Sequence, residues 1–390
     1  MATIGIGATL IQFLGITTGL LPMDDGSARH EAVRNVGLVL AAIIGAPFVM
    51  WRSYVAAKQA SIAEESLFND KINAAAAGLA ARREVSTEWH DDLVTRAITI
   101  DRLEGLVEER PDVAPRVARM LSVYVRELSR EPNNAAQESL WRGFYDMLAE
   151  EGVDVSDAET HFGVLRDQVT INSLKEWARD LKPVRSDMEK ATQALGRLKR
   201  IEGVNADDIP IDLRGANLQG FDLRGLAFER AQMQGARMEG AYLYKAGIEG
   251  ANLYAARLEG AFLYKAQMEG ADLQVAWMEG ADLRAARMEG ANLSKARIEG
   301  ANLIAARMDE KTDFSDAVVR YAAMKWEDKK TVTLSQTQAE SLFGDGSVIL
   351  PEGIDRPGHW PVEDLDWPEF YNRWHAWQVR EGYHPLAQVE

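Results

Sequence analysis

Residues 231–260 read AQMQGARMEGAYLYKAGIEGANLYAARLEG, and an apolar residue returns in them at every fifth position. The same period runs without a slip from Leu213 to Met308, and the residue two places earlier is small, nearly always alanine. The twenty periodic residues are Leu213, Leu218, Leu223, Phe228, Met233, Met238, Leu243, Ile248, Leu253, Leu258, Leu263, Met268, Leu273, Met278, Leu283, Met288, Leu293, Ile298, Leu303 and Met308.

A period of five fits neither the 3.6-residue turn of a helix nor the two-residue alternation of a strand. It fits a solenoid in which each side of a coil is one short extended piece and one turn. Because the interior of such a coil is narrow, each large side chain needs a small neighbour, which explains the alanines. Coils then stack through backbone hydrogen bonds at roughly 4.8 Å. An extra residue at Lys311 shifts the frame, and three more units follow, at Phe314, Val319 and Met324.

Segments such as Ala216–Gly220 (ANLQG) and Ala271–Leu273 (ADL) match the pattern A(D/N)LXX. The tract therefore resembles the pentapeptide-repeat family over nearly a third of the chain. The resemblance implies a right-handed quadrilateral β-helix, in which the 23 units form nearly six coils. The runs at 34–53, 184–200 and 336–360 are similar to proteobacterial members that place a membrane anchor and a helical segment before the repeats. The function of those members is mostly unassigned.

Composition limits the classes of partner and chemistry. The 390 residues include no cysteine, which excludes disulfides, cysteine-based zinc sites and a thiol nucleophile, and is typical of a reducing compartment such as the bacterial cytosol. A formal charge of −16 argues against long-range attraction to nucleic acid or to an anionic membrane surface. We therefore do not expect nucleic acid as a partner.

The N-terminus predicts membrane spans. Ala2–Leu21 carries no charge over about 20 residues, the length that a helix needs to cross a bilayer. Val36–Trp51 is a second, shorter charge-free run, for which a buried pair of apolar helices is the alternative. Gly15 and Gly19 form a small-xxx-small pair that would allow helices to approach closely and oligomerise. Two spans place both termini on one side, and we expect a bacterial inner-membrane protein with most of its chain in the cytoplasm.

The remaining chain divides by composition. The predicted fold class is a multi-domain α+β protein with N-terminal transmembrane helices, an α-helical middle domain, the solenoid and an aromatic C-terminal cap. Ser186 and Glu189 have the spacing of a capping box for the last helix of the middle domain. The expected domains are 1–53 (two transmembrane helices), 54–85 (helical stalk), 86–204 (α-helical domain), 209–326 (repeats) and 327–390 (cap or tail).

Two surfaces of the solenoid follow from a coil of four units. Glu239, Glu259, Glu279 and Glu299 would line one face, beside Arg237, Arg257 and Arg297, and we interpret this as a solvated, self-neutralising face. A second surface would stack aromatic and basic residues of consecutive coils. It is a candidate partner site, although aromatic ladders can also serve only to stabilise a stack. Its residues are Tyr242, Tyr244, Lys245, Phe262, Tyr264 and Lys265, with Tyr254 on the opposite side.

Both ends of the rod need covers, because exposed coil edges invite further pairing. We expect the helix before Glu202 to close one end. The aromatic tail, with Trp360, Trp367, Trp374 and Trp377, would cover the other end, and a dimer contact through this tail is an alternative role.

No catalytic group is expected. His359, His375 and His384 lack metal-ligand spacing and are interpreted as packing or surface residues, and Gly344–Gly346 is an ordinary turn. We predict no catalytic, metal-binding or cofactor-binding residues and no cofactor.

The predicted function is a non-enzymatic, membrane-anchored scaffold that presents the rod to another protein. One alternative is a membrane sensor or effector that oligomerises through its transmembrane helices. Another, implied by the resemblance, is an inhibitor of a topoisomerase that mimics DNA with a strongly acidic rod. The segment 210–310 has 14 acidic and 12 basic side chains, so that electrostatic support is missing.

Overall fold

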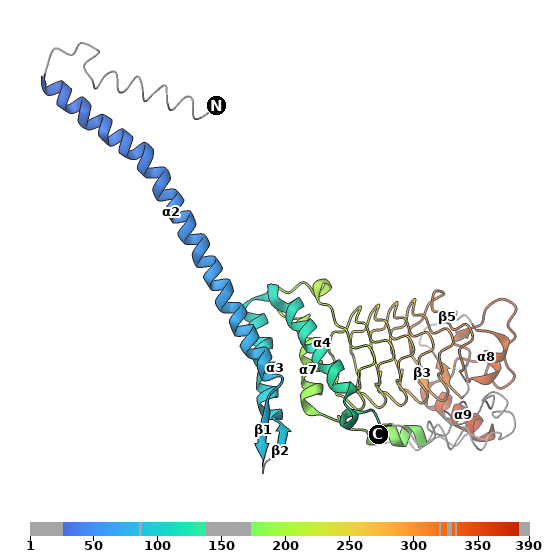
Figure 1. Ribbon diagram of the computed structural model, residues 1–390. Coiled ribbons are helices and arrows are strands. Elements are labelled where there is room, and N and C mark those ends of the chain that lie inside the picture. Colours follow the sequence, from blue (N-terminus) through green and yellow to red (C-terminus); the bar gives the residue numbers. More distant parts are fainter. Residues whose placement is uncertain are drawn as a thin grey trace. The chain divides into compact units, whose positions relative to one another are not determined.

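The structure is a computed structural model and describes residues 26–85, 88–137, 173–319, 321–325, 330–331 and 334–381 (Figure 1). The chain forms two compact units, Met1–Ala74 and Ala75–Glu390. We describe each unit by itself.

The first unit contains most of helix α2 (Gly26–Gly78), which continues through Pro47. In the part of the chain that the structure describes, no helix is long and apolar enough to cross a membrane. The predicted second span, Val36–Trp51, lies within α2 and is therefore not supported. Its charge-free run is bounded by Arg34 and Arg52 and falls short of the roughly 20 residues that a span requires. The predicted first span, with Gly15 and Gly19, lies outside the described residues.

The second unit begins with a hairpin and a small group of helices. Strands β1 (Arg82–Val85) and β2 (Glu88–Asp91) pair antiparallel, so the helical stalk predicted over 54–85 instead ends at Gly78. Gly78 packs against α3 (Leu93–Glu109), and a Cβ at this position would lie 2.1 Å from Thr99 Oγ1. Helices α3 and α4 (Ala114–Arg130) pack on α7 (Ser186–Leu198). A further helical segment covers 173–180, and the short 3-10 helices are η1 (Pro111–Val113), η2 (Pro132–Asn134) and η3 (Ala206–Asp208).

The repeat tract forms coils of 20 residues. Parallel bridges join residues 20 positions apart, from Asp212 with Gln232 onward, and each coil contains four extended positions and four turns. All twenty periodic apolar residues are buried, at most 3% exposed. The pairing distance is 21 across the turn around Lys311, as for Asn292 with Asp313, and returns to 20 for Ala323 with Phe343, so the extra residue is absorbed in that turn. The coils lie side by side between the helical group and the C-terminal residues (Figure 1).

The first coil is closed by α4 and α7. In later coils, the N–H of the residue before each central apolar residue donates to the preceding coil. The first coil has no preceding coil, and four acceptors from the helices take that place, one on each side of the coil. The N–H groups of Asp212, Asn217, Asp222 and Ala227 donate to Ser122 Oγ (3.2 Å), Ser129 Oγ (3.0 Å), Glu189 Oε1 (2.7 Å) and the Gly196 carbonyl (3.2 Å), respectively.

The spacing of these acceptors has a helical reason. Ser122 and Ser129 lie seven residues apart on α4, and Glu189 and Gly196 lie seven residues apart on α7. Seven residues make nearly two turns, so each pair lies on one face of its helix. The predicted capping box of Ser186 and Glu189 is wrong, because Arg185 is the N-cap residue of α7 and Glu189 is engaged with the coil.

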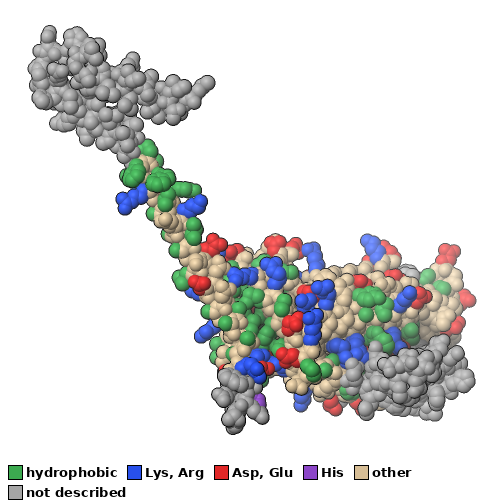
Figure 2. All heavy atoms as spheres, viewed as in Figure 1, with side chains coloured by type: hydrophobic (Ala, Val, Ile, Leu, Met, Phe, Trp, Pro, Cys, Tyr) green, Lys and Arg blue, Asp and Glu red, His purple; other side chains and the backbone are tan. Residues whose placement is uncertain are grey.

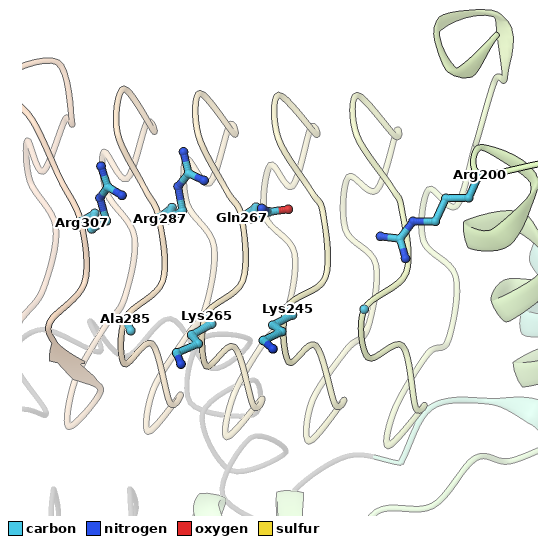
Figure 3. Close-up of a pocket in the computed structure, with 8 residues that line it drawn as sticks. Arg200, Lys245, Lys265, Gln267, Ala285, Arg287 and Arg307 are labelled. Atoms are coloured by element: carbon cyan, nitrogen blue, oxygen red, sulfur yellow. The ribbon is translucent and has the colours of Figure 1, made fainter.

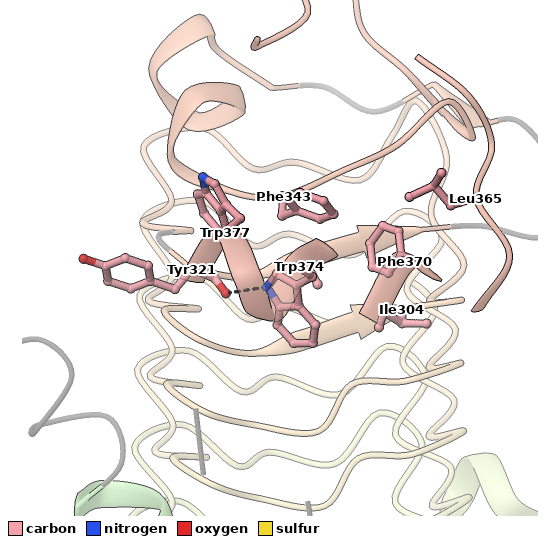
Figure 4. Packing of buried hydrophobic residues seen from close by; sticks show 8 residues of the cluster. Ile304, Tyr321, Phe343, Leu365, Phe370, Trp374 and Trp377 are labelled. Carbon is pink, nitrogen blue, oxygen red and sulfur yellow. Dashed lines mark hydrogen bonds between the residues drawn. The ribbon is translucent and has the colours of Figure 1, made fainter. Parts of the chain in front are cut away.

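The last coil is covered by the C-terminal residues (Figure 4). Strand β3 (Asn302–Ile304) pairs with β4 (Ala323–Lys325), and β5 (Lys330–Thr331) with β6 (Val348–Ile349), both parallel. Helices α8 (Gln336–Ser341) and α9 (Trp367–Arg380) follow. The buried cluster over the coil comprises Ile304, Tyr321, Ala323, Phe343, Leu365, Phe370, Trp374 and Trp377.

Polar groups of this cap also bind carbonyl groups at the end of the rod. Trp374 Nε1 (3.3 Å) and Gln378 Nε2 (3.0 Å) both donate to the Tyr321 carbonyl. Gln338 Nε2 donates to the carbonyls of Phe314 and Ala317. The two ends of the solenoid are therefore closed by hydrogen bonds as well as by apolar contact.

Replacing Glu189 tests the first closure. Glu189→Ala leaves the N–H of Asp222 without an acceptor and should lower the free energy of unfolding by about 1–3 kcal/mol. Glu189→Gln keeps an acceptor oxygen and should lose much less. Urea denaturation of both variants measures the difference, and equal losses would show that the hydrogen bond to the coil edge is unimportant.

Candidate functional site

The four sides of the solenoid differ in what covers them. We name them by the central residue of one coil: side A (Leu243), side B (Ile248), side C (Leu253) and side D (Leu258). Residues 20 apart lie on the same side in adjacent coils. Acidic and basic side chains are interspersed over the face in view (Figure 2). A candidate site is therefore sought in local clusters of side chains on each side of the solenoid.

Side A carries the predicted aromatic residues in two stacks. The rings of Tyr242 and Phe262 are 4.8 Å apart and nearly parallel, at 7°. The rings of Tyr244 and Tyr264 are 5.6 Å apart at 27°. Stacked aromatic pairs contribute about 0.5–1.5 kcal/mol beyond their burial, yet Tyr242 remains 38% exposed. The stacks therefore stabilise the coils and also present aromatic edges to solvent.

Lys245 and Lys265 stand at the corner between sides A and B. Both have left-handed backbone, with φ of 54° and 58°, a conformation that costs a non-glycine residue roughly 1–2 kcal/mol. Each ammonium lies 5.0 Å from the ring centre of the preceding tyrosine. In the coil before them, Gly225 occupies the equivalent corner. The lysines are therefore held where glycine would be less strained.

A groove of about 560 Å³ runs along this corner (Figure 3). Five of its eight lining residues are basic, and none is acidic. Arg287 and Arg307 occupy the same position in consecutive coils, as do Lys245 and Lys265, whereas Arg200 lies in the turn after α7. The lining residues are Arg200, Gly225, Lys245, Lys265, Gln267, Ala285, Arg287 and Arg307.

The two ends of side A are covered by other elements. Near the first coil, Gln193 Nε2 of α7 donates to the Asp222 carbonyl. Near the last coil, Asn302 Nδ2 lies 3.5 Å from Tyr371 Oη of α9. The aromatic stacks lie in the coils between these contacts.

Side D is not the solvated face that the sequence led us to expect. Glu239, Glu259, Glu279 and Glu299 are at most 6% exposed. Arg237 Nε lies 2.7 Å from Glu239 Oε1, and Arg297 bridges Glu279 and Glu299 at 2.9 and 3.0 Å. Burial raises the pKa of Glu239 although Arg237 and Arg257 act in the opposite direction. The carboxylates are therefore part of the interior of the unit.

Residues 174–182 cover side D by packing on its glycines. Gly220, Gly240, Gly260 and Gly280 have φ between 64° and 69°, and each has backbone or side-chain atoms of this segment close by. A Cβ at Gly240 would lie 2.0 Å from the Ala178 carbonyl oxygen. Lys175 Nζ donates to the Gly300 carbonyl at 3.0 Å. The sequence did not reveal this cover, because nothing in 174–182 shares the period of the repeats.

The same Glu–Gly spacing recurs on side B. Among the residues that the structure describes, nothing lies within 4 Å of a Cβ built at Gly270 or Gly290. The described part of the chain therefore leaves side B open at these two positions, next to the basic groove.

The C-terminal histidines have packing roles. His359 stacks on Trp377 with ring centres 4.9 Å apart, and its Nε2 lies 2.8 Å from the Leu342 carbonyl. His375 stacks on Trp374 at 5.2 Å, and His384 lies outside the described residues. Among the residues that the structure describes, no group of three or more His, Cys, Asp or Glu side chains is arranged to hold a metal ion.

The sequence predicted the aromatic residues and the two lysines of this surface, whereas Arg200, Arg287 and Arg307 were not predicted. The signal for the last two was available, because residues 20 apart share a side and Arg287 and Arg307 keep that spacing. Arg200 lies outside the repeats, and no periodicity places it beside them.

The comparisons with known proteins concern the repeats. Residues 211–246, 248–284 and 278–318 match the family model for pentapeptide repeats, in 8 copies. The tract therefore consists of pentapeptide repeats, as the resemblance predicted. No curated protein sequence matches the chain.

Several solved structures are similar to part of the chain. A pentapeptide repeat protein from the cyanobacterium Cyanothece 51142 is 27% identical over 27% of this chain and 65% of its own, with a TM-score of 0.19. One from the Arabidopsis thaliana thylakoid lumen is 28% identical over 33% and 74%, with a TM-score of 0.20. QnrB1, a plasmid-mediated fluoroquinolone resistance protein, is 15% identical over 46% and 86%, with a TM-score of 0.25.

A matched pair of glycine variants tests the cover of side D. Gly240→Ala and Gly290→Ala both place alanine in left-handed backbone, but only the first also meets Ala178. Both should lose roughly 1–2 kcal/mol of stability. Gly240→Ala should in addition release the covering segment, so that trypsin cleaves faster after Lys175 and Arg179. Equal cleavage rates in the two variants would contradict the contact.

Proposed function

Because the tract at 211–318 consists of pentapeptide repeats, we propose that this protein is a non-enzymatic scaffold whose solenoid binds another protein through side A. The supporting observation is the pair of aromatic stacks with their lysines, in coils that neither α7 nor α9 covers. Exposed aromatic residues grouped with cations are typical of binding hot spots. We name the binding surface by its residues: Tyr242, Tyr244, Lys245, Phe262, Tyr264 and Lys265.

The rigidity of the solenoid supports this proposal. Each coil is hydrogen-bonded to the next along every side, so the side chains of side A are held in fixed rows before a partner arrives. A surface ordered in advance loses less entropy on binding. The stacking of Tyr242 on Phe262 and of Tyr244 on Tyr264 restricts these rings further.

Inhibition of a topoisomerase by DNA mimicry is less well supported. Mimicry requires a field of negative charge on the rod. Here the charges of segment 210–310 nearly cancel, and the groove beside side A is lined by cations. The similarity to QnrB1 amounts to 15% sequence identity at a TM-score of 0.25 and carries no argument for function.

Replacement of the stacked tyrosines tests the binding surface. The double variant Tyr244→Ala/Tyr264→Ala should lose a partner that the unaltered protein captures from detergent-solubilised native membranes. Tyr254→Ala is the control, because Tyr254 is 44% exposed on side C and should keep the same partner. Retention of every partner by the double variant would mean that the stacks are only structural.

We also propose that the N-terminal segment anchors the scaffold at the bacterial inner membrane, with the solenoid in the cytoplasm. This rests on the charge-free sequence of Ala2–Leu21. It agrees with the exposure of Phe48, Met50 and Trp51, which are 58–71% exposed. A large apolar surface of this kind is usually covered by lipid or by protein.

Deletion of residues 1–53 tests the anchor. The shortened protein should move from the membrane pellet to the supernatant and still capture the partner, since the binding surface lies in the second unit. Loss of the biological effect with binding intact would favour the sensor or effector role. If the deleted protein stays in the pellet after a carbonate wash, the anchor lies elsewhere.

A further inference from the structure

The groove between sides A and B has an excess of positive charge. Arg287 Nη2 pairs with Glu269 at 2.5 Å, and Arg307 Nε pairs with Glu289 at 2.9 Å. For Arg200, Lys245 and Lys265, the described residues provide no carboxylate within ion-pair distance. Five cations thus face two carboxylates along one groove.

The neighbouring carboxylates of side B do not cancel this excess. Glu229 pairs with Lys199 at 3.5 Å, outside the residues that line the groove. Glu249 does not line the groove either, although it acts electrostatically on Arg287. Counted with Glu269 and Glu289, it leaves three carboxylates against the five cations that line the groove. The groove therefore keeps an excess of positive charge.

The two lysines give their corner a charge that its neighbours along the row lack. The equivalent corner is Gly225 in the preceding coil and Ala285 in the following one. Left-handed backbone is common to these turns, since Ala255 and Ala285 also adopt it, so the conformation does not depend on lysine. Lys245 and Lys265 line the groove in consecutive coils (Figure 3), and each ammonium lies over the ring of the preceding tyrosine.

We propose that this groove binds an extended, acidic segment of the partner protein, with its carboxylates on Lys245, Lys265 and Arg200. Apolar side chains of the same segment would contact Tyr242 and Phe262. The inference rests on the proposed binding role of side A and adds the chemistry of the partner. Charge complementarity of this kind mainly sets specificity and association rate.

Single-stranded nucleic acid fits the site less well. Its bases need free aromatic faces on which to stack. Here Tyr242 and Phe262 cover each other at 4.8 Å, and the faces of Tyr244 and Tyr264 are taken by each other and by the lysine ammonium groups. A single inorganic phosphate would occupy only a small part of a groove of about 560 Å³.

The test uses the full-length protein in detergent and fluorescence anisotropy. The probes are a fluorescein-labelled peptide of alternating glutamate and glycine, the same peptide with glutamine in place of glutamate, and a labelled oligothymidylate of similar length. The glutamate peptide should bind and should weaken about 10-fold when salt rises from about 50 to 300 mM, because exposed charges are screened. The glutamine peptide should not bind measurably.

Lysine variants locate the site. Lys265→Gly should weaken the glutamate peptide severalfold, and Lys245→Gly/Lys265→Gly about 10-fold or more. Lys295→Gly is the matched control, because Lys295 has the same left-handed backbone (φ 57°) and the same charge but lies on side C. Glycine suits these positions, so all variants should fold, and circular dichroism melting checks this.

Each outcome decides the inference. Equal weakening by Lys295→Gly and Lys265→Gly, equal binding of the glutamine peptide, or tighter binding of the oligothymidylate would overturn it. If Tyr244→Ala/Tyr264→Ala loses the native partner while Lys245→Gly/Lys265→Gly keeps it, the partner does not bind through an acidic segment in the groove, and its binding to the aromatic residues of side A stands. If the groove binds the glutamate peptide but the tyrosine variant keeps every partner, the role of side A fails instead.

Discussion

The structure depends on one constraint, which is that no coil of the solenoid satisfies its own backbone. Each coil exchanges N–H and C=O bonds with its neighbours, so the unpaired groups collect at the two ends. Buried polar groups without hydrogen-bond partners are costly. The helical group and the C-terminal cap supply such partners to the backbone at the two ends of the solenoid. Ser122, Ser129 and Glu189 supply acceptors at one end, whereas Gln338, Trp374 and Gln378 supply donors at the other.

The sequence predicted those parts of the fold that a period can encode. The five-residue repeat identified every central residue from Leu213 to Met308, and the match to pentapeptide repeats agrees with it. Contacts between the repeats and elements outside them could not be predicted from the five-residue period. The seven-residue spacing of Ser122 and Ser129 is visible only when the coil edge is known, and Glu189 was assigned to a capping box for the same reason. The cover of side D by 174–182 was missed, and so its glutamates were expected in solvent.

In the candidate site too, the residues within the repeats could be predicted from the period, whereas a residue outside the repeats could not. Tyr242, Tyr244 and their partners one coil later follow from the 20-residue coil, whereas Arg200 reaches the groove from the turn after α7. Two kinds of covering leave this surface open: the segment 174–182 closes side D, and α7 and α9 occupy the ends of side A. The accessible region is thus defined as much by what the other parts of the chain cover as by the repeats themselves.

The 20-residue coil limits how such a rod can change its length. An insertion of 20 residues would add one coil, lengthen the rod by roughly 4.8 Å and return every later side chain to its own side. An insertion of ten residues would exchange side A with side C and side B with side D beyond it. The glycine row under 174–182 would survive this exchange, because Glu–Gly pairs recur every ten residues and Gly270 and Gly290 of side B would enter it. The aromatic stacks would not survive it, because Tyr242 and Phe262 are 20 residues apart and a half coil inserted between them would place them on opposite sides. A rod of this kind can therefore keep one continuous aromatic surface only if it grows by whole coils.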